Sequence, residues 1–406
     1  MRIPRSFRTE SSEYLTIPIL KSFCNSVNLR TTYDRAQLIE SIETFSEQNQ
    51  ENEKIVSKWL DGVLKEGIKH IYARKVFAQD NRMELLKYET TALSILREVF
   101  PTCPMTPVIQ GNHNKDITVQ NYGYIITNGV IDSIWFTLTQ LLLEANGVSE
   151  PGDKIIYPIF IDIDLKNGYI IGRAKSKANI FNDDGSGISS EKTRTTVDKQ
   201  IKLGIDKIIK QLNLTIESVE SANAGFKHAL YKTLCDFTFT PDEIKEQIDD
   251  YELVIDQFII QTFKDLDIDP LKDRNYEKAQ SDIRIFIEKY ISINYPDRSI
   301  FTKDREAYPI RLASTDSEQT RVDEASGNSE PLQCKEKFFD NKKSTVLEMT
   351  CDRLTLCYNR KERYFGNTPF IVKILTKTGY CILRFESYVE EDDIQNVLSR
   401  IIRNRE

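Results

Sequence analysis

Two stretches of the chain decide its fold: YGYIITNGVIDSIWFTLTQLLL (residues 122–143) and IIYPIFIDIDLKNGYIIGRAKSK (residues 155–177). Apolar and polar residues alternate with a period of two in both stretches, which is the pattern of strands with one buried face. An Asn-Gly pair divides each stretch, Asn128-Gly129 in the first and Asn167-Gly168 in the second. This dipeptide suits the positive φ angles of a tight hairpin turn. The sequence therefore predicts a four-stranded antiparallel meander.

Helical patterns lie on both sides of this meander. Residues 51–77 and 81–100 carry apolar side chains at intervals of three or four, which predicts amphipathic helices before the strands. The same spacing predicts helices over residues 195–212 and 242–264, the latter started by a Thr240 cap and a following proline. The buried face of that last helix is expected to consist of Ile244, Ile248, Tyr251, Ile255, Phe258 and Ile259.

The rest of the chain completes an α+β protein. Residues 314–331 are mostly small and polar, which predicts a long loop. Residues 346–358, 370–376 and 380–386 predict strands, and residues 392–403 predict a final helix. The expected organisation is a helical module (1–48), helices followed by the antiparallel meander (49–180), a linker (181–195), a central helical block (196–298) and a C-terminal β region with a terminal helix (299–406).

Composition excludes several classes of protein. The 406 residues are 40% hydrophobic and 29% charged, which supports a folded core rather than disorder. No apolar run approaches the roughly 18 residues that cross a bilayer, and no signal-peptide pattern is present, so we expect a cytoplasmic protein. Seven cysteines without a CxxC and three distant histidines indicate neither a disulfide framework nor a zinc site. The net charge of −7 disfavours nonspecific coating of nucleic acid, but a local basic surface can still bind phosphate.

The most informative segment for function is LTIPILKSFCNSVNLRTTYDRAQLIESI, residues 15–42. Its pattern predicts two short helices joined by a polar link, with Asp34 capping the second. The segment resembles the SAP motif, a helix–extended–helix module whose family commonly binds DNA with little sequence preference. By that resemblance the phosphate-facing residues are Lys21, Arg30, Thr31, Thr32 and Arg35. The chain departs from the family where Tyr33, Asp34 and Arg35 replace the usual glycine and lysine.

Asp162, Asp164 and Lys166 are the closest approach to a catalytic constellation. Carboxylates two residues apart share one face of a strand, where they can hold Mg²⁺ beside a lysine, as a metal-dependent nuclease requires. Their alternation with Ile161 and Ile163 fits equally the solvated side of a half-buried strand. Because the next strand has no acidic residue, we favour this second interpretation, and Mg²⁺ is expected only under the nuclease alternative.

Two basic clusters are further candidates for nucleic-acid contact. Arg173, Lys175 and Lys177 alternate along one strand, which places three positive charges on one side. The second cluster consists of Arg353, Arg360, Lys361 and Arg363, interleaved with Tyr358, Tyr364 and Phe365. Such a combination can neutralise phosphate and stack on bases. The same residues also fit lysines that protect a sheet edge and aromatic side chains that belong to the core.

Together these patterns favour a non-catalytic DNA-binding protein, and the Ile, Lys and Asn usage suggests a bacterial or mobile-element source. Its N-terminal module would anchor to the duplex backbone, while the remainder recognises a protein partner or self-associates. No cofactor and no membrane contact are expected. Two alternatives stay open: a Mg²⁺-dependent nuclease centred on Asp162 and Asp164, and a protein-interaction scaffold whose N-terminal helices pack internally without touching nucleic acid.

Overall fold

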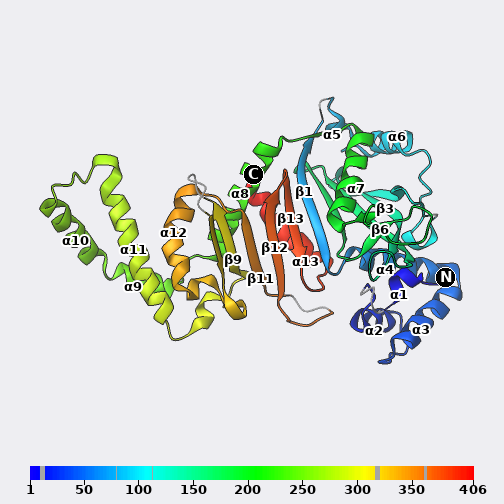
Figure 1. Ribbon diagram of the computed structural model, residues 1–406, viewed down its shortest axis with the longest axis horizontal. Helices are drawn as coiled ribbons and strands as arrows, with labels where there is room; N and C mark the ends of the chain where they lie inside the picture. Colours follow the sequence, from blue (N-terminus) through cyan, green and yellow to red (C-terminus); the bar gives the residue numbers. More distant parts are fainter. Residues whose placement is uncertain (10–13, 79, 112, 316–320, 361–363) are drawn as a thin grey trace. The chain divides into compact units, whose positions relative to one another are not determined.

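A computed structural model describes residues 1–406 except 10–13, 79, 112, 316–320 and 361–363 (Figure 1). The chain divides into two compact units. Unit 1 comprises Met1–Asn223, Arg360–Phe370 and Lys377–Val397, and unit 2 comprises Ala224–Asn359, Ile371–Thr376 and Leu398–Glu406. Both units combine helices with antiparallel strands, so the predicted α+β class is confirmed. No described helix is long and apolar enough to cross a membrane.

The sheet of unit 1 has the strand order β13-β1-β5-β4-β3-β6-β7, with β2 added on β3 and β8 on β1. The predicted meander is present as β2 (Thr118–Thr127), β3 (Val130–Glu144), β4 (Asp153–Asp164) and β5 (Tyr169–Lys175). The other strands are β1 (Lys69–Phe77), β6 (Ile180–Asn182), β7 (Arg194–Thr195), β8 (Thr215–Ile216) and β13 (Tyr380–Phe385). Strand β5 therefore lies in the interior of the sheet, between β1 and β4.

The two predicted turns of the meander differ in detail. Asn128 and Gly129 both have positive φ, as the tight hairpin requires. At the second turn only Gly168 does, because four residues connect β4 to β5. Asp164 shapes this longer turn by accepting hydrogen bonds from the backbone and side-chain nitrogens of Asn167, at 2.9 and 2.7 Å.

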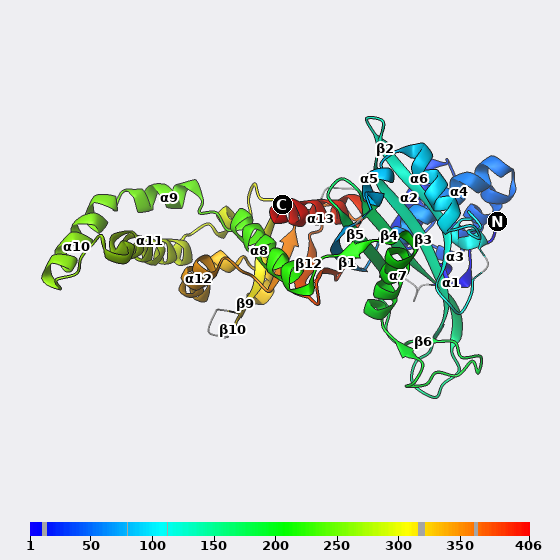
Figure 2. The ribbon, with the colours of Figure 1, turned by 90° about the horizontal axis from the view of Figure 1, so that it is seen from above.

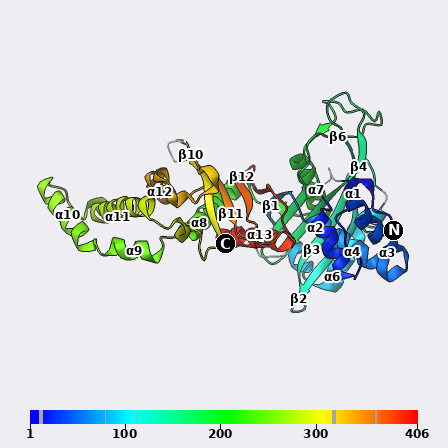
Figure 3. The same ribbon diagram turned by 90° about the horizontal axis from the view of Figure 1, so that it is seen from below.

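Helices cover both faces of this sheet (Figure 2). Helix α7 (Val197–Leu212) packs on one face, where a Cβ at Gly172 of β5 would lie only 2.7 Å from Ile201. The N-terminal helices lie beside the sheet (Figure 3), and Phe160 of β4 belongs to the core that they form. These helices are α1 (Arg5–Arg8), α2 (Ile17–Ser26), α3 (Arg35–Glu47) and α4 (Gln50–Lys65). A strand covered on both faces buries the side chains of both faces.

Three local predictions in unit 1 were wrong. Residues 69–77, expected to continue a helix, form β1, which is stabilised by pairing with β5 and β13, far away in sequence. The expected helix over residues 81–100 is split into α5 (Arg82–Leu85) and α6 (Glu89–Val99). Residues 181–195, expected as a linker, contain parts of β6 and β7, which pair with each other.

Unit 2 has the strand order β10-β9-β11-β12. Its strands are β9 (Ala307–Thr315), β10 (Arg321–Ala325), β11 (Arg353–Tyr358) and β12 (Phe370–Lys377). Its helices include α8 (Val219–Phe237), which begins in unit 1, and α9 (Asp242–Asp249), α10 (Glu252–Asp265), α11 (Asn275–Asn294) and α12 (Glu336–Glu348). Helices α9 and α10 both contact α11. The terminal helix α13 (Glu391–Arg405) begins in unit 1.

The sequence predictions for unit 2 also need correction. The expected loop over residues 314–331 contains β10, and only the last part of 346–358 is a strand, because α12 extends to Glu348. The expected helix over residues 242–264 breaks at Tyr251. Thr240 does not cap it, since its hydroxyl donates to Glu288 at 2.8 Å. Phe258, expected to be buried, is 60% exposed.

Candidate functional site

The N-terminal helices lie where the sequence placed them. Helix α2 has Pro18 in its first turn, and α3 begins after Asp34, whose carboxylate accepts hydrogen bonds from the backbone nitrogens of Ala36 and Gln37 at 2.8 and 3.2 Å. Their apolar faces, including Phe23 and Leu38, are buried in the core that these helices share with α4. A polar link of residues 27–34 connects the two helices.

The five residues assigned to phosphate contact fall into two groups. Arg30 and Thr31 are exposed on the link, and the Lys21 ammonium lies 3.0 Å from the ring centroid of Tyr33, which is 86% exposed. The side chains of Thr32 and Arg35 instead form hydrogen bonds with the backbone of this chain.

The Thr32 hydroxyl bonds the backbone of Asp34, and Arg35 donates to the carbonyl oxygens of Arg8 and Thr9, both at 3.0 Å. We define Lys21, Arg30, Thr31 and Tyr33 as the link rim.

The acidic pair on β4 is engaged in local structure. Asp162 lies 3.2 Å from Arg173, and Asp164 shapes the turn through Asn167. Lys166 is exposed on that turn. Among the described residues, no group of three or more His, Cys, Asp or Glu side chains is arranged to hold a metal ion.

The first basic cluster does not form the exposed face expected of it. Arg173 and Lys175 are only 3% and 2% exposed, and Lys177 pairs with Glu144 at 2.5 Å. The prediction failed because β5 is an interior strand with helices on both faces, so the alternating charges point toward protein instead of water.

The second basic cluster is likewise only partly accessible. Arg353 is half-buried at the start of β11, and Arg360 is buried, with its Nε 3.6 Å from Asp393. Lys361 and Arg363 lie outside the described residues. Of the aromatic members, Tyr358 is buried, and Tyr364 and Phe365 are half-buried. These positions favour a structural role for Arg360, which also donates to the backbone oxygen of Tyr388.

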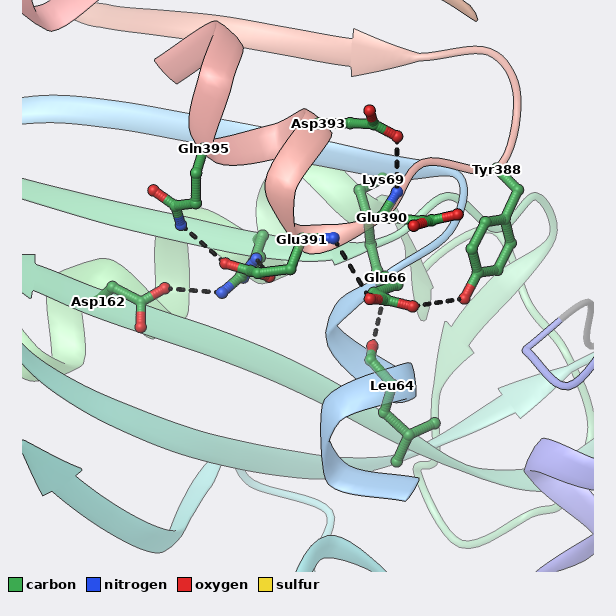
Figure 4. Close-up of polar contacts among 10 residues, drawn as sticks. Leu64, Glu66, Lys69, Asp162, Tyr388, Glu390, Glu391, Asp393 and Gln395 are labelled. Atoms are coloured by element: carbon green, nitrogen blue, oxygen red, sulfur yellow. Dashed lines mark hydrogen bonds and ion pairs between the residues drawn. The ribbon is translucent and has the colours of Figure 1, made fainter. Parts of the chain in front are cut away.

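The structure instead brings together charged residues that the sequence analysis did not connect (Figure 4). We call Glu66, Lys69, Asp162, Arg173, Lys175, Tyr388 and Glu391 the buried charge network. They come from the residue after α4, from β1, β4 and β5, from the segment between β13 and α13, and from the first residue of α13. Lys69 and Lys175 are directly opposite each other in the β1–β5 register. Two lysines in this position repel each other wherever both are charged.

Arg173 is the central cation of the network. Its guanidinium donates to Glu391 at 2.5 Å and to Asp162 at 3.2 Å, which ties α13 to the sheet. Glu66 makes a second connection, because it accepts from the Tyr388 hydroxyl at 3.0 Å and from the Glu391 backbone nitrogen at 3.3 Å. A carboxylate beside the first turn of a helix interacts favourably with the helix dipole.

Lys69 is the most deeply buried member of the network. It is fully buried and donates to the carbonyl oxygen of Leu64 at 2.6 Å, while the Tyr14 ring centroid lies 5.3 Å from its nitrogen. Burial, together with the positive charges of Lys175 and Arg173, holds the pKa of Lys69 well below its ordinary value. A neutral amine is a nucleophile in principle, but complete burial favours a structural role here.

Sequence reasoning missed this network because its members are distant in the chain. Lys69 and Glu391 are separated by more than three hundred residues, and neither belongs to a recognisable motif. A signal did exist at the end of β5 and just after it, where Arg173, Lys175 and Lys177 alternate with Ala174 and Ser176. It was uninformative without knowledge that α13 and the N-terminal helices cover that side.

Comparison of the chain with protein-family models, curated proteins and solved structures gives no match. The geometry of the described residues therefore carries the functional argument.

Proposed function

We propose that this protein binds DNA without catalysis, through backbone contacts made by the link rim of unit 1. The observation that carries the proposal is the exposed position of Arg30, Thr31 and Tyr33 on the link, with the ammonium of the half-buried Lys21 over the Tyr33 ring. Ammonium, guanidinium and hydroxyl groups are the usual donors to phosphate oxygens, and such contacts carry no sequence information. A rim of this kind binds duplex backbone with weak sequence preference.

The geometry also limits the strength of this binding. Arg35 already donates to two carbonyl oxygens, and Asp34 places a carboxylate at the start of α3. Two cations therefore remain for phosphate, Lys21 and Arg30. Each phosphate neutralised by a cation contributes about 0.9 to the slope of log affinity against log salt, so we expect the rim to contribute a slope of about 2.

The experiment measures fluorescence anisotropy of a labelled duplex with the full chain at several salt concentrations. Replacing Lys21→Ala and Arg30→Ala together should reduce the salt slope by about 2 and weaken binding of all duplex sequences alike. The matched control is Lys272→Ala with Lys278→Ala, two exposed lysines of unit 2, which should leave the slope unchanged. Absence of binding at low salt, or an unchanged slope in the rim variant, would reject the proposal.

Unit 2 supports a second role in partner recognition or assembly. Helices α10 and α11 expose large apolar side chains: Leu253, Val254, Phe258, Ile260, Phe286 and Tyr290. Exposed apolar groups gathered on neighbouring helices are typical of a surface that another protein covers. This observation favours a scaffold function for unit 2, carried out by the same chain that binds DNA through unit 1.

A further inference from the structure

A groove of about 720 Å³ in unit 1 is separate from the link rim and from the buried charge network. Helix α4 forms one wall, and Pro107, Gln110 and two residues of β3, Trp135 and Thr137, form the other. This volume is within the range of sites that hold small molecules, roughly 300 to 1,000 Å³.

The α4 wall presents charged side chains on one helical face. Lys54, Lys58, Asp61 and Lys65 follow one another at intervals of four, three and four residues, and all of them line the groove. Lys54 and Lys58 are exposed. The other acidic residue of the wall, Glu53, accepts a hydrogen bond from Gln110 at 3.2 Å across the groove. Three lysines against two carboxylates leave this wall with a net positive charge, which suits an anionic ligand.

The opposite wall presents an aromatic ring in a fixed position. Trp135 is paired with Gly123 of β2, and a Cβ at Gly123 would lie only 2.4 Å from the indole. Glycine therefore allows the ring to lie against the backbone of the neighbouring strand. The Lys65 ammonium lies 4.9 Å from the ring centroid, so a cation and an aromatic surface meet inside the groove.

Asp61 is the acidic residue of the α4 wall between Lys58 and Lys65 in sequence. Its Oδ1 atom is buried without a hydrogen-bond partner among the described residues. Burial raises the pKa of Asp61 to about 6, although the Val108 amide and Lys65 act to lower it. A carboxylate held in a groove under these conditions is stabilised by any ligand that brings a hydrogen-bond donor.

We propose that this groove binds a nucleotide whose base carries an exocyclic amine, with the base against Trp135, the amine directed to Asp61 and the phosphate at Lys54 and Lys58. The opposite wall supplies an aromatic surface for the base, and the α4 wall supplies an acceptor for the amine and cations for the phosphate. The nucleotide can be free or can be one unit of a single strand, since both carry the same groups. The proposal does not rest on DNA binding by the link rim.

Intrinsic fluorescence provides a direct test, because the chain has two tryptophans and one of them, Trp135, lines the groove. The other, Trp59, is stacked on Phe23 with ring centroids 4.2 Å apart and serves as an internal reference. The full chain is titrated with AMP, IMP, oligo(dA) and oligo(dI). We expect AMP or oligo(dA) to quench the emission at least tenfold more tightly than IMP or oligo(dI), whose base has the same two rings but an oxygen in place of the exocyclic amine. Tighter binding of oligo(dA) than AMP would identify a single strand as the source, and the reverse would identify a free nucleotide.

Three variants decide the proposal. Trp135→Phe should remove the quenching signal, and Asp61→Leu, which has a similar volume but no acceptor oxygen, should remove the preference for the amine-bearing base. Lys54→Ala with Lys58→Ala should weaken AMP binding at least tenfold, and both lysines are exposed, so this variant is expected to fold. The rim variant Lys21→Ala with Arg30→Ala should retain full quenching, which separates failure of this site from failure of the rim. No quenching by any ligand at millimolar concentration, or an unchanged response in Asp61→Leu and in the double lysine variant, would overturn the proposal.

Discussion

Unit 1 buries several charged side chains, whereas unit 2 exposes several large apolar ones. In unit 1, Lys69, Arg173 and Lys175 are buried, although lysine and arginine are almost never fully buried unless they are paired. In unit 2, Leu253 and Phe258 are exposed to solvent on α10. The spacing of apolar and charged residues along the sequence therefore shows which side chains share a face of a helix or strand. Whether that face is covered depends on the neighbouring helices and strands.

The buried charges of unit 1 and the exposed apolar side chains of unit 2 also suit different functions. In unit 1, Arg173 is paired with Asp162 and Glu391, and Glu66 accepts from the Glu391 backbone nitrogen. These contacts connect α4, the sheet and α13 in the unit that carries the link rim and the groove. The exposed apolar side chains of α10 and α11 contribute nothing comparable within unit 2. They gain stabilisation only when another molecule covers them.

The largest expected effect is loss of the central cation of the buried charge network. Arg173→Ala should lower the free energy of unfolding of unit 1 by about 3 to 5 kcal/mol, because Asp162 and Glu391 lose the guanidinium that compensates them. Urea unfolding followed by tryptophan fluorescence measures unit 1 selectively, since Trp59 and Trp135 both belong to it. Lys199→Ala, at an exposed position, is the control and should change stability by less than about 0.5 kcal/mol. A loss below 1 kcal/mol in Arg173→Ala would show that the network is not structural.

A smaller effect is expected from two adjacent residues of α10. Ile259 is 1% exposed and Phe258 is 60% exposed. Ile259→Ala should destabilise unit 2 by about 2 to 4 kcal/mol, whereas Phe258→Ser should change stability by less than about 0.5 kcal/mol. Hydrogen exchange of peptides from α10 measures the change in stability caused by each of the two substitutions.

Light scattering of the same two variants tests whether the exposed side chains of α10 mediate self-association. If the chain self-associates through this helix, Phe258→Ser should shift it toward the monomer without unfolding it. Equal destabilisation by both variants would mean that Phe258 belongs to the core and that the contrast between the units is wrong for α10.

The smallest expected effect is the contribution of Lys69 to the pH dependence of the free energy of unfolding. Its lowered pKa means that the unfolded chain binds this proton more readily than the folded chain. Between the lowered pKa and the ordinary value of 10.5, the Lys69 contribution to unfolding free energy therefore rises with pH, by at most about 1.4 kcal/mol per pH unit. Lys69→Met should flatten this rise in urea unfolding at pH 7, 8 and 9, and Lys199→Met should not. An identical pH profile in Lys69→Met and the parent chain would mean that Lys69 stays charged in the folded state.

Much of the fold could be predicted from local patterns. The Asn128-Gly129 hairpin, the capping of α3 by Asp34 and the helix–link–helix order of residues 15–47 all depend on residues close in sequence. Such features follow from backbone preferences and short-range hydrogen bonds, so the amino-acid order is sufficient to specify them.

The environment of each face could not be predicted in the same way. Whether Arg173 meets water or Glu391, whether residues 69–77 continue a helix or pair as β1, and whether Trp135 lines a groove all depend on elements far away in the chain. Burial is a property of the assembled layers, because a strand alternates its side chains identically whether helices cover one face of its sheet or both.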